Sequence, residues 1–250
     1  NDKCHFLLVV FKLFLQKLHK IMESKTIAQI VSSDIRTSKI FKKYDIDFCC
    51  GGGKQLSKVC KEKNIKKSII IDEIKSLDNK KNKNKFNNME LEVLIEHINT
   101  THHTYVREMI PIINQFAKKV SKVHGTSNPE TILIAEIFSE LSNELLLHLI
   151  KEEKILFPHI IKLSSKKKNK RHFSTSKSYG KALNEIRMME WEHDEAGNSL
   201  KQIKQLTNNY TLPPHACNTF KALYHNLKEF QDDLHIHIHL ENNILFPKVL

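Results

Sequence analysis

Six residues in the second half of the chain have the types and spacing of metal ligands. His148 and Glu152 are four positions apart, and so are His237 and Glu241. Residues at this spacing lie on one face of a helix, so each imidazole would point the same way as its carboxylate. The alternation of His and Ile at residues 235–239 would by itself favour a β-strand. A repeat within the chain favours the helix.

The repeat links residues 148–158, HLIKEEKILFP, to residues 237–247, HIHLENNILFP. Both stretches read His-x3-Glu-x2-Ile-Leu-Phe-Pro. A further histidine precedes each stretch, because His103 lies 45 residues before His148 and His193 lies 44 residues before His237. Each half of this region therefore combines a helix carrying one histidine with a helix carrying a His–Glu pair.

Four imidazoles and two carboxylates indicate two divalent transition ions bridged by Glu152 and Glu241. Mixed nitrogen and oxygen donors suit iron or manganese, and the lack of thiolates disfavours a structural zinc site. Glu144 and Asp233, one turn before the motif histidines, could orient the ligand imidazoles or be exposed charges. Histidines 235 and 239 lie about 200° round the helix from His237 and should be solvated, the alternative being a second metal pair.

Four long helices must position these residues. The apolar periodicity predicts helices at about 89–122, 130–163, 178–207 and 214–247, and the short breaks between them indicate an antiparallel four-helix bundle over residues 89–250. Residues 22–77 are expected to form a small helical domain, and the Lys/Asn-rich residues 78–88 a linker. The chain is thus predicted to be all-α. Residues 1–21 are interpreted as an upstream or non-native segment, with a targeting peptide or an extra helix as alternatives.

The small domain contains adjacent cysteines, Cys49 and Cys50, before a run of three glycines. They could be small buried hydrophobes, or they could act in redox chemistry, metal transfer or nitrosyl binding. A helix beginning after the glycines, together with Lys54, would lower a thiol pKa and favour the second interpretation. Cys60 and Cys217 are expected to be inert. Five irregularly spaced cysteines fit a reducing compartment better than a disulfide framework.

The net charge of +12 does not by itself indicate a nucleic-acid partner. Much of the basic excess lies in two polar segments without interleaved aromatics or a recognition motif, so we expect no specific nucleic-acid binding. The apolar stretch near the start is too short and too charged for a membrane span, so no membrane partner is expected.

These motifs resemble those of the hemerythrin-like HHE cation-binding domain. The chain from about Thr26 is similar to the repair of iron centres family, which joins a short N-terminal domain to a di-iron, hemerythrin-like bundle. The stretch FKKYDIDFCCGGGKQL resembles that family's N-terminal signature, and EHDEAGNSL and HLENNILFP resemble its bundle motifs. The third glycine and the lysine-rich segment at 166–177 depart from the family pattern, and neither affects a ligand.

The resemblance assigns the residue roles and implies a function. The family's ligands to two Fe ions fall on His103, His148, Glu152, His193, His237 and Glu241, and its paired cysteines on Cys49 and Cys50. It implies a cytoplasmic stress protein that donates iron to damaged iron-sulfur proteins. A homodimer is left open as its assembly. Reduction of nitric oxide at the di-iron centre, or sensing of O2 or NO, are the alternatives; reversible O2 storage fits less well.

Overall fold

The computed structural model describes residues 24–77, 85–168 and 177–249, and the segment 1–21 lies outside these ranges. The chain divides into two compact units between Asn88 and Met89. The described residues form helices and no strand, apart from an isolated bridge between Thr26 and Gln55. The predicted all-α class is therefore confirmed.

Residues 24–77 of the first unit form four short helices: α2 (Ile27–Ser33), α3 (Thr37–Lys43), α4 (Leu56–Glu62) and α5 (Lys67–Ser76). A capping box starts α2, because the Thr26 hydroxyl accepts from the Gln29 N–H and the Gln29 side chain accepts from the Thr26 N–H. Side chains from all four helices and the loop before α4 share one apolar core, which includes Ile27, Val31, Phe41, Phe48, Leu56, Ile70 and Ile71.

The described part of the second unit forms four helical rods. The first runs through α6 (Leu91–His97), the π-helical turn η1 (Ile98–His103) and α7 (Thr104–His124). The second joins α8 (Glu130–Lys151), η2 (Glu152–Leu156) and α9 (Phe157–Lys168), and the third is α10 (Lys177–Leu206). The fourth joins α11 (Asn218–Leu240), η3 (Glu241–Leu245) and α12 (Phe246–Val249).

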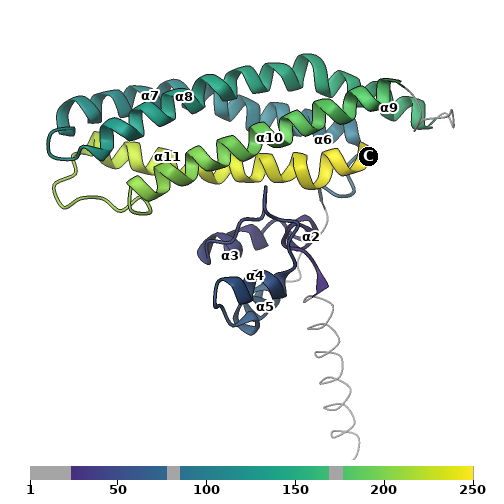
Figure 1. The fold of residues 1–250 in the computed structure, drawn as a ribbon, viewed down its shortest axis with the longest axis horizontal. Helices are drawn as coiled ribbons and strands as arrows, with labels where there is room; N and C mark the ends of the chain where they lie inside the picture. Colours follow the sequence, from purple (N-terminus) through teal and green to yellow (C-terminus); the bar gives the residue numbers. More distant parts are fainter. Residues whose placement is uncertain (1–23, 78–84, 169–176, 250) are drawn as a thin grey trace, which may run out of the picture. The chain divides into compact units, whose positions relative to one another are not determined.

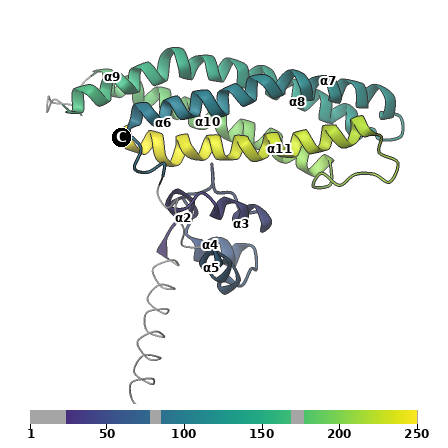
Figure 2. The same cartoon turned by 180° about the vertical axis from the view of Figure 1, so that it is seen from behind.

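The rods pack side by side as a bundle (Figure 1), and the view from behind shows the same arrangement (Figure 2). Helix α7 packs against α8 and α11, and α10 packs against the same two helices, while α12 of the fourth rod also contacts α9 of the second. The predicted bundle is present, and its last rod starts at Asn218 rather than near 214 because the chain after Leu212 forms a Pro-rich connection. Nowhere in the described ranges does a helix combine the length and apolarity needed to cross a membrane.

Three of the rods change from α to π geometry for one turn. Two of these turns have a local cause, because Pro158 and Pro247 lie two residues after the ends of η2 and η3. Proline cannot donate the backbone hydrogen bond to the residue four positions earlier, and its ring displaces that carbonyl. A wider turn accommodates the displacement, and such turns are frequent at functional sites. Every π turn here contains or borders residues of the predicted metal site.

Candidate metal centre

The six predicted ligand side chains meet inside the bundle. Each rod contributes: His103 ends η1, His148 lies on α8 with Glu152 starting η2, His193 lies on α10, and His237 lies on α11 with Glu241 starting η3. None of the six is more than 3% exposed. The repeat seen in the sequence therefore corresponds to one shared cluster built from both halves of the bundle.

The cluster consists of two four-residue groups that share both carboxylates. His103 and His237 face each other with 3.1 Å between their Nε2 atoms, and His148 and His193 do the same at 3.1 Å. In each group, one donor atom from each histidine and from each glutamate lies within 4.8 Å of the others. Two cations could therefore be held side by side, each by two imidazoles, with both glutamates shared between them.

The carboxylate oxygens show that the donor set fits a cation. His103 Nε2 lies 3.3 Å from Glu152 Oε2, and His193 Nε2 lies 3.1 Å from Glu241 Oε2. These contacts lack hydrogen-bond geometry, and all four oxygens of the two buried glutamates have no hydrogen-bond partner. Buried charges without partners are costly, and a metal ion would compensate them. Nitrogen and oxygen donors without thiolates suit iron or manganese.

The two carboxylates also set the protonation of the ligands. Burial alone would lower the pKa of His103, but the carboxylates of Glu152 and Glu241 raise it to about 10. The pKa of His148 is likewise raised to about 10 against the effect of burial, chiefly by Glu152. Burial and repulsion from Glu241 oppose ionisation of Glu152, yet His148 and His103 hold its pKa at about 2. In the chain without metal, protons on imidazoles thus balance the buried carboxylates.

Outer side chains orient three of the four imidazoles. The Nδ1–H of His103 donates to Glu153 Oε1 over 2.8 Å, and that of His148 donates to Glu192 Oε2 over 2.7 Å. The Nδ1–H of His193 donates to Asn242 Oδ1 over 2.8 Å. Because each acceptor receives a hydrogen bond from Nδ1–H, it keeps the proton on Nδ1 and leaves Nε2 facing the centre.

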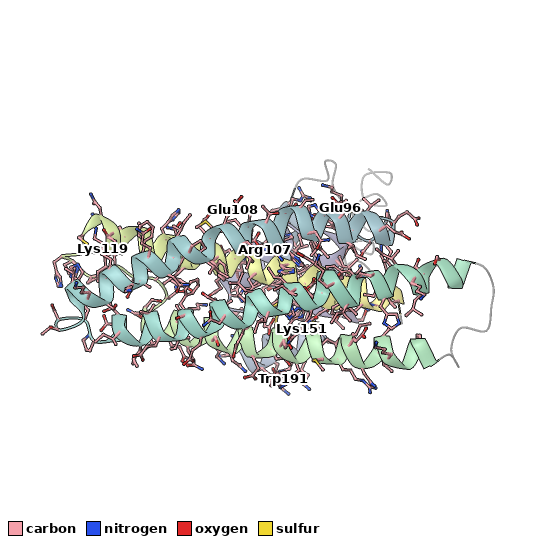
Figure 3. The ribbon with its side chains drawn as sticks, turned by 90° about the horizontal axis from the view of Figure 1, so that it is seen from above. Glu96, Arg107, Glu108, Lys119, Lys151 and Trp191 are labelled. Carbon is pink, nitrogen blue, oxygen red and sulfur yellow. The ribbon has the colours of Figure 1, made fainter. Side chains whose placement is uncertain are left out.

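Two basic side chains near the surface form ion pairs with the two glutamates that accept from His103 and His148. Arg107 lies 2.8 Å from Glu153, and Lys151 forms an ion pair with Glu192. Figure 3 labels both cations near the middle of the bundle, while Trp191, the neighbour of Glu192, is at its outer edge. The pKa of Glu153 and that of Glu192 are lowered despite partial burial, because a cation and a histidine contact each carboxylate.

The expectation that Glu144 and Asp233 orient ligand imidazoles is wrong, whereas the alternative of an exposed charge holds for Glu144. Glu144 is exposed, and Asp233 bonds to the Nδ1 of His102 over 2.9 Å rather than to a ligand. The acceptors come from neighbouring rods instead: Glu153 lies in η2, Asn242 in η3 and Glu192 on the continuous helix α10. The acceptors were missed, although each directly adjoins a ligand in sequence: Glu153 follows Glu152, Glu192 precedes His193, and Asn242 follows Glu241.

The expectation of a solvated surface at residues 235 and 239 is wrong for His239, which is fully buried, while His235 is half-buried. Five successive residues from His237 to Glu241 are all 0% exposed. The last turns of α11 are enclosed because this rod contacts η1 as well as α7 and α10. His239 Nδ1 lies 3.2 Å from Asn243 Nδ2, and neither belongs to the two ligand groups.

The cysteine pair lies in the first unit, in a loop organised by Asp47. Its Oδ1 accepts from the backbone N–H groups of Cys49 and Cys50, and its Oδ2 accepts from that of Gly51. The Cys49 thiol also contacts Asp47 Oδ1 at 3.3 Å. A Cβ at Gly52 would lie 2.5 Å from a backbone oxygen of this loop, so the turn requires glycine there.

The expected lowering of a thiol pKa is wrong for Cys49. The Cys50 thiol, burial and the Asp47 carboxylate raise the pKa of Cys49 well above its ordinary value. Helix α4 begins only at Leu56, and Lys54 pairs with Glu62, so neither acts on this thiol. Cys50 is partly exposed.

The two other described cysteines were expected to be inert. Cys60 is buried, and burial raises the pKa of its thiol. Cys217 is exposed, with its sulfur 3.3 Å from His124 Nε2. Burial therefore agrees with the expectation for Cys60, whereas Cys217 is open to solvent.

Comparisons with known proteins match both units. Residues 23–78 match ScdA_N, a domain of unknown function (DUF542), and residues 94–249 match the hemerythrin HHE cation binding domain. A probable iron-sulfur cluster repair protein of Haemophilus influenzae is 41% identical over 216 residues, which cover 85% of this chain and 91% of that protein. The iron-sulfur cluster repair protein YtfE of Escherichia coli is 37% identical over 224 residues, 90% of this chain and 96% of the relative.

Proposed function

Because the chain belongs to the family of iron-sulfur cluster repair proteins that carry a hemerythrin HHE cation binding domain, we propose that it restores damaged clusters by donating iron. The observation that carries the proposal is the buried cluster of six side chains with four carboxylate oxygens that lack hydrogen-bond partners. A purely structural core would not retain two adjacent buried carboxylates without partners.

We propose that the metal ligands are His103, His148, Glu152, His193, His237 and Glu241, and that they hold two iron ions. Bound iron would supply a redox-active Lewis acid to this buried site. The residues of the chain bind and orient: the imidazoles present Nε2, and the shared glutamates tie the two groups together. Shared ligands also mean that the loss of one ion changes how the other is held.

In this proposal, iron is both bound by the protein and delivered by it to the damaged cluster. The metal-free cluster can be neutralised by protons, since the carboxylates raise the pKa of His103 and of His148 to about 10. When an ion leaves, water can supply the protons that keep the buried glutamates compensated. This exchange of protons for metal lowers the cost of an empty site, which suits a donor better than a structural metal site.

For Cys49 and Cys50 we propose a role in receiving or passing iron, with Cys50 as the first thiol to react. Its support is the loop geometry, in which Asp47 contacts the buried Cys49 thiol while Cys50 is partly exposed. Transfer assays with Cys50→Ala should show slower repair, and Cys49→Ala should affect repair less. Equal rates for both variants and the unmodified chain would contradict this role.

The test of the main proposal uses an iron-sulfur enzyme whose cluster has lost iron. The anaerobically purified, iron-loaded chain should contain about two irons and restore enzyme activity. The metal-free chain should restore nothing. An equal concentration of free ferrous iron, added without the chain, is the control. If free iron restores activity as fast as the loaded chain, donation by the protein is refuted.

A further inference from the structure

The internal repeat relates the side chains that accept hydrogen bonds from the ligand histidines. Each such acceptor lies on a neighbouring rod, directly next to another ligand in the sequence. His103 is supported by the residue that follows Glu152, and His193 by the residue that follows Glu241. These two contacts are equivalent under the internal repeat. A second equivalent pair of positions lies just before His193 and just before His103.

The second pair of positions breaks the symmetry. Glu192, before His193, accepts the Nδ1 proton of His148 over 2.7 Å. His102 occupies the equivalent position before His103, and it contacts His237 through its ring, with centroids 5.6 Å apart and planes at 7°. A parallel ring presents no acceptor in the plane of its neighbour. The Nδ1 atom of His237 is accordingly buried without a hydrogen-bond partner.

The ring of His102 is itself held in this orientation. Its Nδ1 lies 2.9 Å from Asp233 Oδ1, and the residue is only 5% exposed. The second oxygen of Asp233 is also buried without a partner. In the group of His148 and His193, both imidazoles therefore donate a hydrogen bond from Nδ1 to an outer acceptor. In the group of His103 and His237, only His103 does so.

We infer that the position formed by His103 and His237 is the labile one, and that the stacked His102 makes it so. The inference rests on the proposed iron donation and identifies the ion donated first. An outer acceptor fixes the orientation of a ligand imidazole and raises its basicity, and its removal typically weakens metal binding about 10- to 100-fold. Only His237 lacks such an acceptor among the four ligand histidines.

The step is a ligand exchange. One ferrous ion passes to the acceptor with its charge unchanged, no electron moves, and the vacated imidazole and carboxylate groups take up protons from water. The fully supported group retains its ion, so the chain would release one ion per encounter and keep the second.

Release to an excess of ferrous chelator, followed by absorbance under anaerobic conditions, tests the inference without any repair assay. The iron-loaded chain should lose one ion in a fast phase and one in a phase about 10-fold slower or more. Loss of both ions at a single rate would overturn the inference. Two phases without any restoration of a damaged cluster would leave the inference standing and refute the proposed function instead.

Substitution of His102 identifies the fast position. In His102→Gln, the side-chain oxygen can accept from His237 and the amide nitrogen can donate to Asp233, so the fast phase should slow about 10-fold towards the slow one. His102→Phe, the matched control, keeps an aromatic ring but offers no acceptor, and its fast phase should not slow. Equal fast phases in the Gln and Phe variants would overturn the inference.

Asn242 provides the reciprocal test. Asn242→Leu removes the acceptor of His193 with little change in volume, so the slow phase should accelerate about 10-fold or more. Asn243→Leu alters the neighbouring side chain, which contacts His239 rather than a ligand, and should leave both phases unchanged. Acceleration of the fast phase instead of the slow phase by Asn242→Leu would contradict the assignment.

Discussion

At the residue scale, the centre depends on two carboxylates that the fold buries beside each other. Each raises the free energy of the other's ionised form, yet both keep a lowered pKa because imidazoles surround them. Such an arrangement is stable only while protons or cations compensate it. Protons and the proposed metal ions would therefore compete for the same few nitrogen and oxygen atoms.

Glu152→Gln should reduce the iron content from two ions per chain to one or none, because the substitution removes a charge that both ligand groups share. The adjacent Glu153→Gln is the matched control. It keeps an oxygen that can accept from His103, so two ions should still bind, less tightly. Metal analysis after gel filtration provides the measurement, and two tightly bound ions in Glu152→Gln would contradict the assignment.

Iron binding should release protons, and the affinity should rise with pH until about pH 10. The pKa of His103 and that of His148 are raised to about 10 in the metal-free chain, so both imidazoles carry an extra proton near neutral pH. Metal requires the neutral form, and each rise in pH removes competing protons. Titration calorimetry in two buffers with different ionisation enthalpies measures the release; identical enthalpies in both buffers would contradict it.

The two adjacent cysteines should differ in reactivity. Cys50 is partly exposed, while Cys49 is 5% exposed and its thiol pKa is raised by Cys50, burial and Asp47. Iodoacetamide near neutral pH should therefore modify Cys50 several-fold faster, as followed by peptide mass spectrometry. The exposed Cys217 serves as a reactive reference and the buried Cys60 as an unreactive one. Faster modification of Cys49 than of Cys50 would be inconsistent with this loop structure.

At the element scale, the π turns place the ligands. Glu152 and Glu241 begin η2 and η3, and His103 ends η1. A π turn holds more residues than an α turn, so it changes which side chains face the bundle axis on either side of it. Helix α10 carries only one of the six proposed ligands, His193, and no π turn interrupts its described length.

Pro158→Ala should weaken iron binding because the restored N–H allows an α-helix to compete with η2, which carries Glu152. Pro111→Ala is the control, since Pro111 is exposed inside α7 and no π turn directly precedes it. That variant should gain stability, by up to about 3 kcal/mol in the free energy of unfolding, with unchanged iron content. Chelator competition and thermal unfolding provide the two measurements; unchanged affinity in Pro158→Ala would show that the proline does not maintain the turn.

At the scale of the whole molecule, the chain has two cores that serve different chemistry. The first unit packs a small apolar core around the cysteine loop, whereas the bundle buries the six proposed metal ligands among its rods. Because all six ligands lie in the bundle, metal occupancy should stabilise this unit and not the other.

Removal of iron should therefore lower the unfolding temperature of the bundle alone. Ligand present at about 100 times its Kd stabilises the binding unit by about 2.7 kcal/mol, and this stabilisation disappears with the metal. Hydrogen exchange of the whole chain, with and without chelator, should show faster exchange in α8 and α11 and unchanged exchange in α2–α5. Equal changes in both units would imply that metal acts on more than the bundle.

The sequence alone determined the ligand types, their spacing and the helices that carry them. A repeated His-x3-Glu motif, with one further histidine before each copy, identified six residues that the structure brings together. The motif could be read from the sequence because one-face spacing is a local property of a helix. The four rods followed from apolar periodicity for the same reason. Repetition of the motif also settled the conflict between helix and strand at residues 235–239.

Only the tertiary structure decided what surrounds those ligands. The acceptors Glu153, Glu192 and Asn242 act across rods, and the burial of His239 depends on contacts from neighbouring elements. The raised pKa of Cys49 likewise depends on how its loop folds around Asp47. These features arise from packing between segments far apart in the chain or from the exact path of a turn, and neither is encoded in the spacing of residues along one helix.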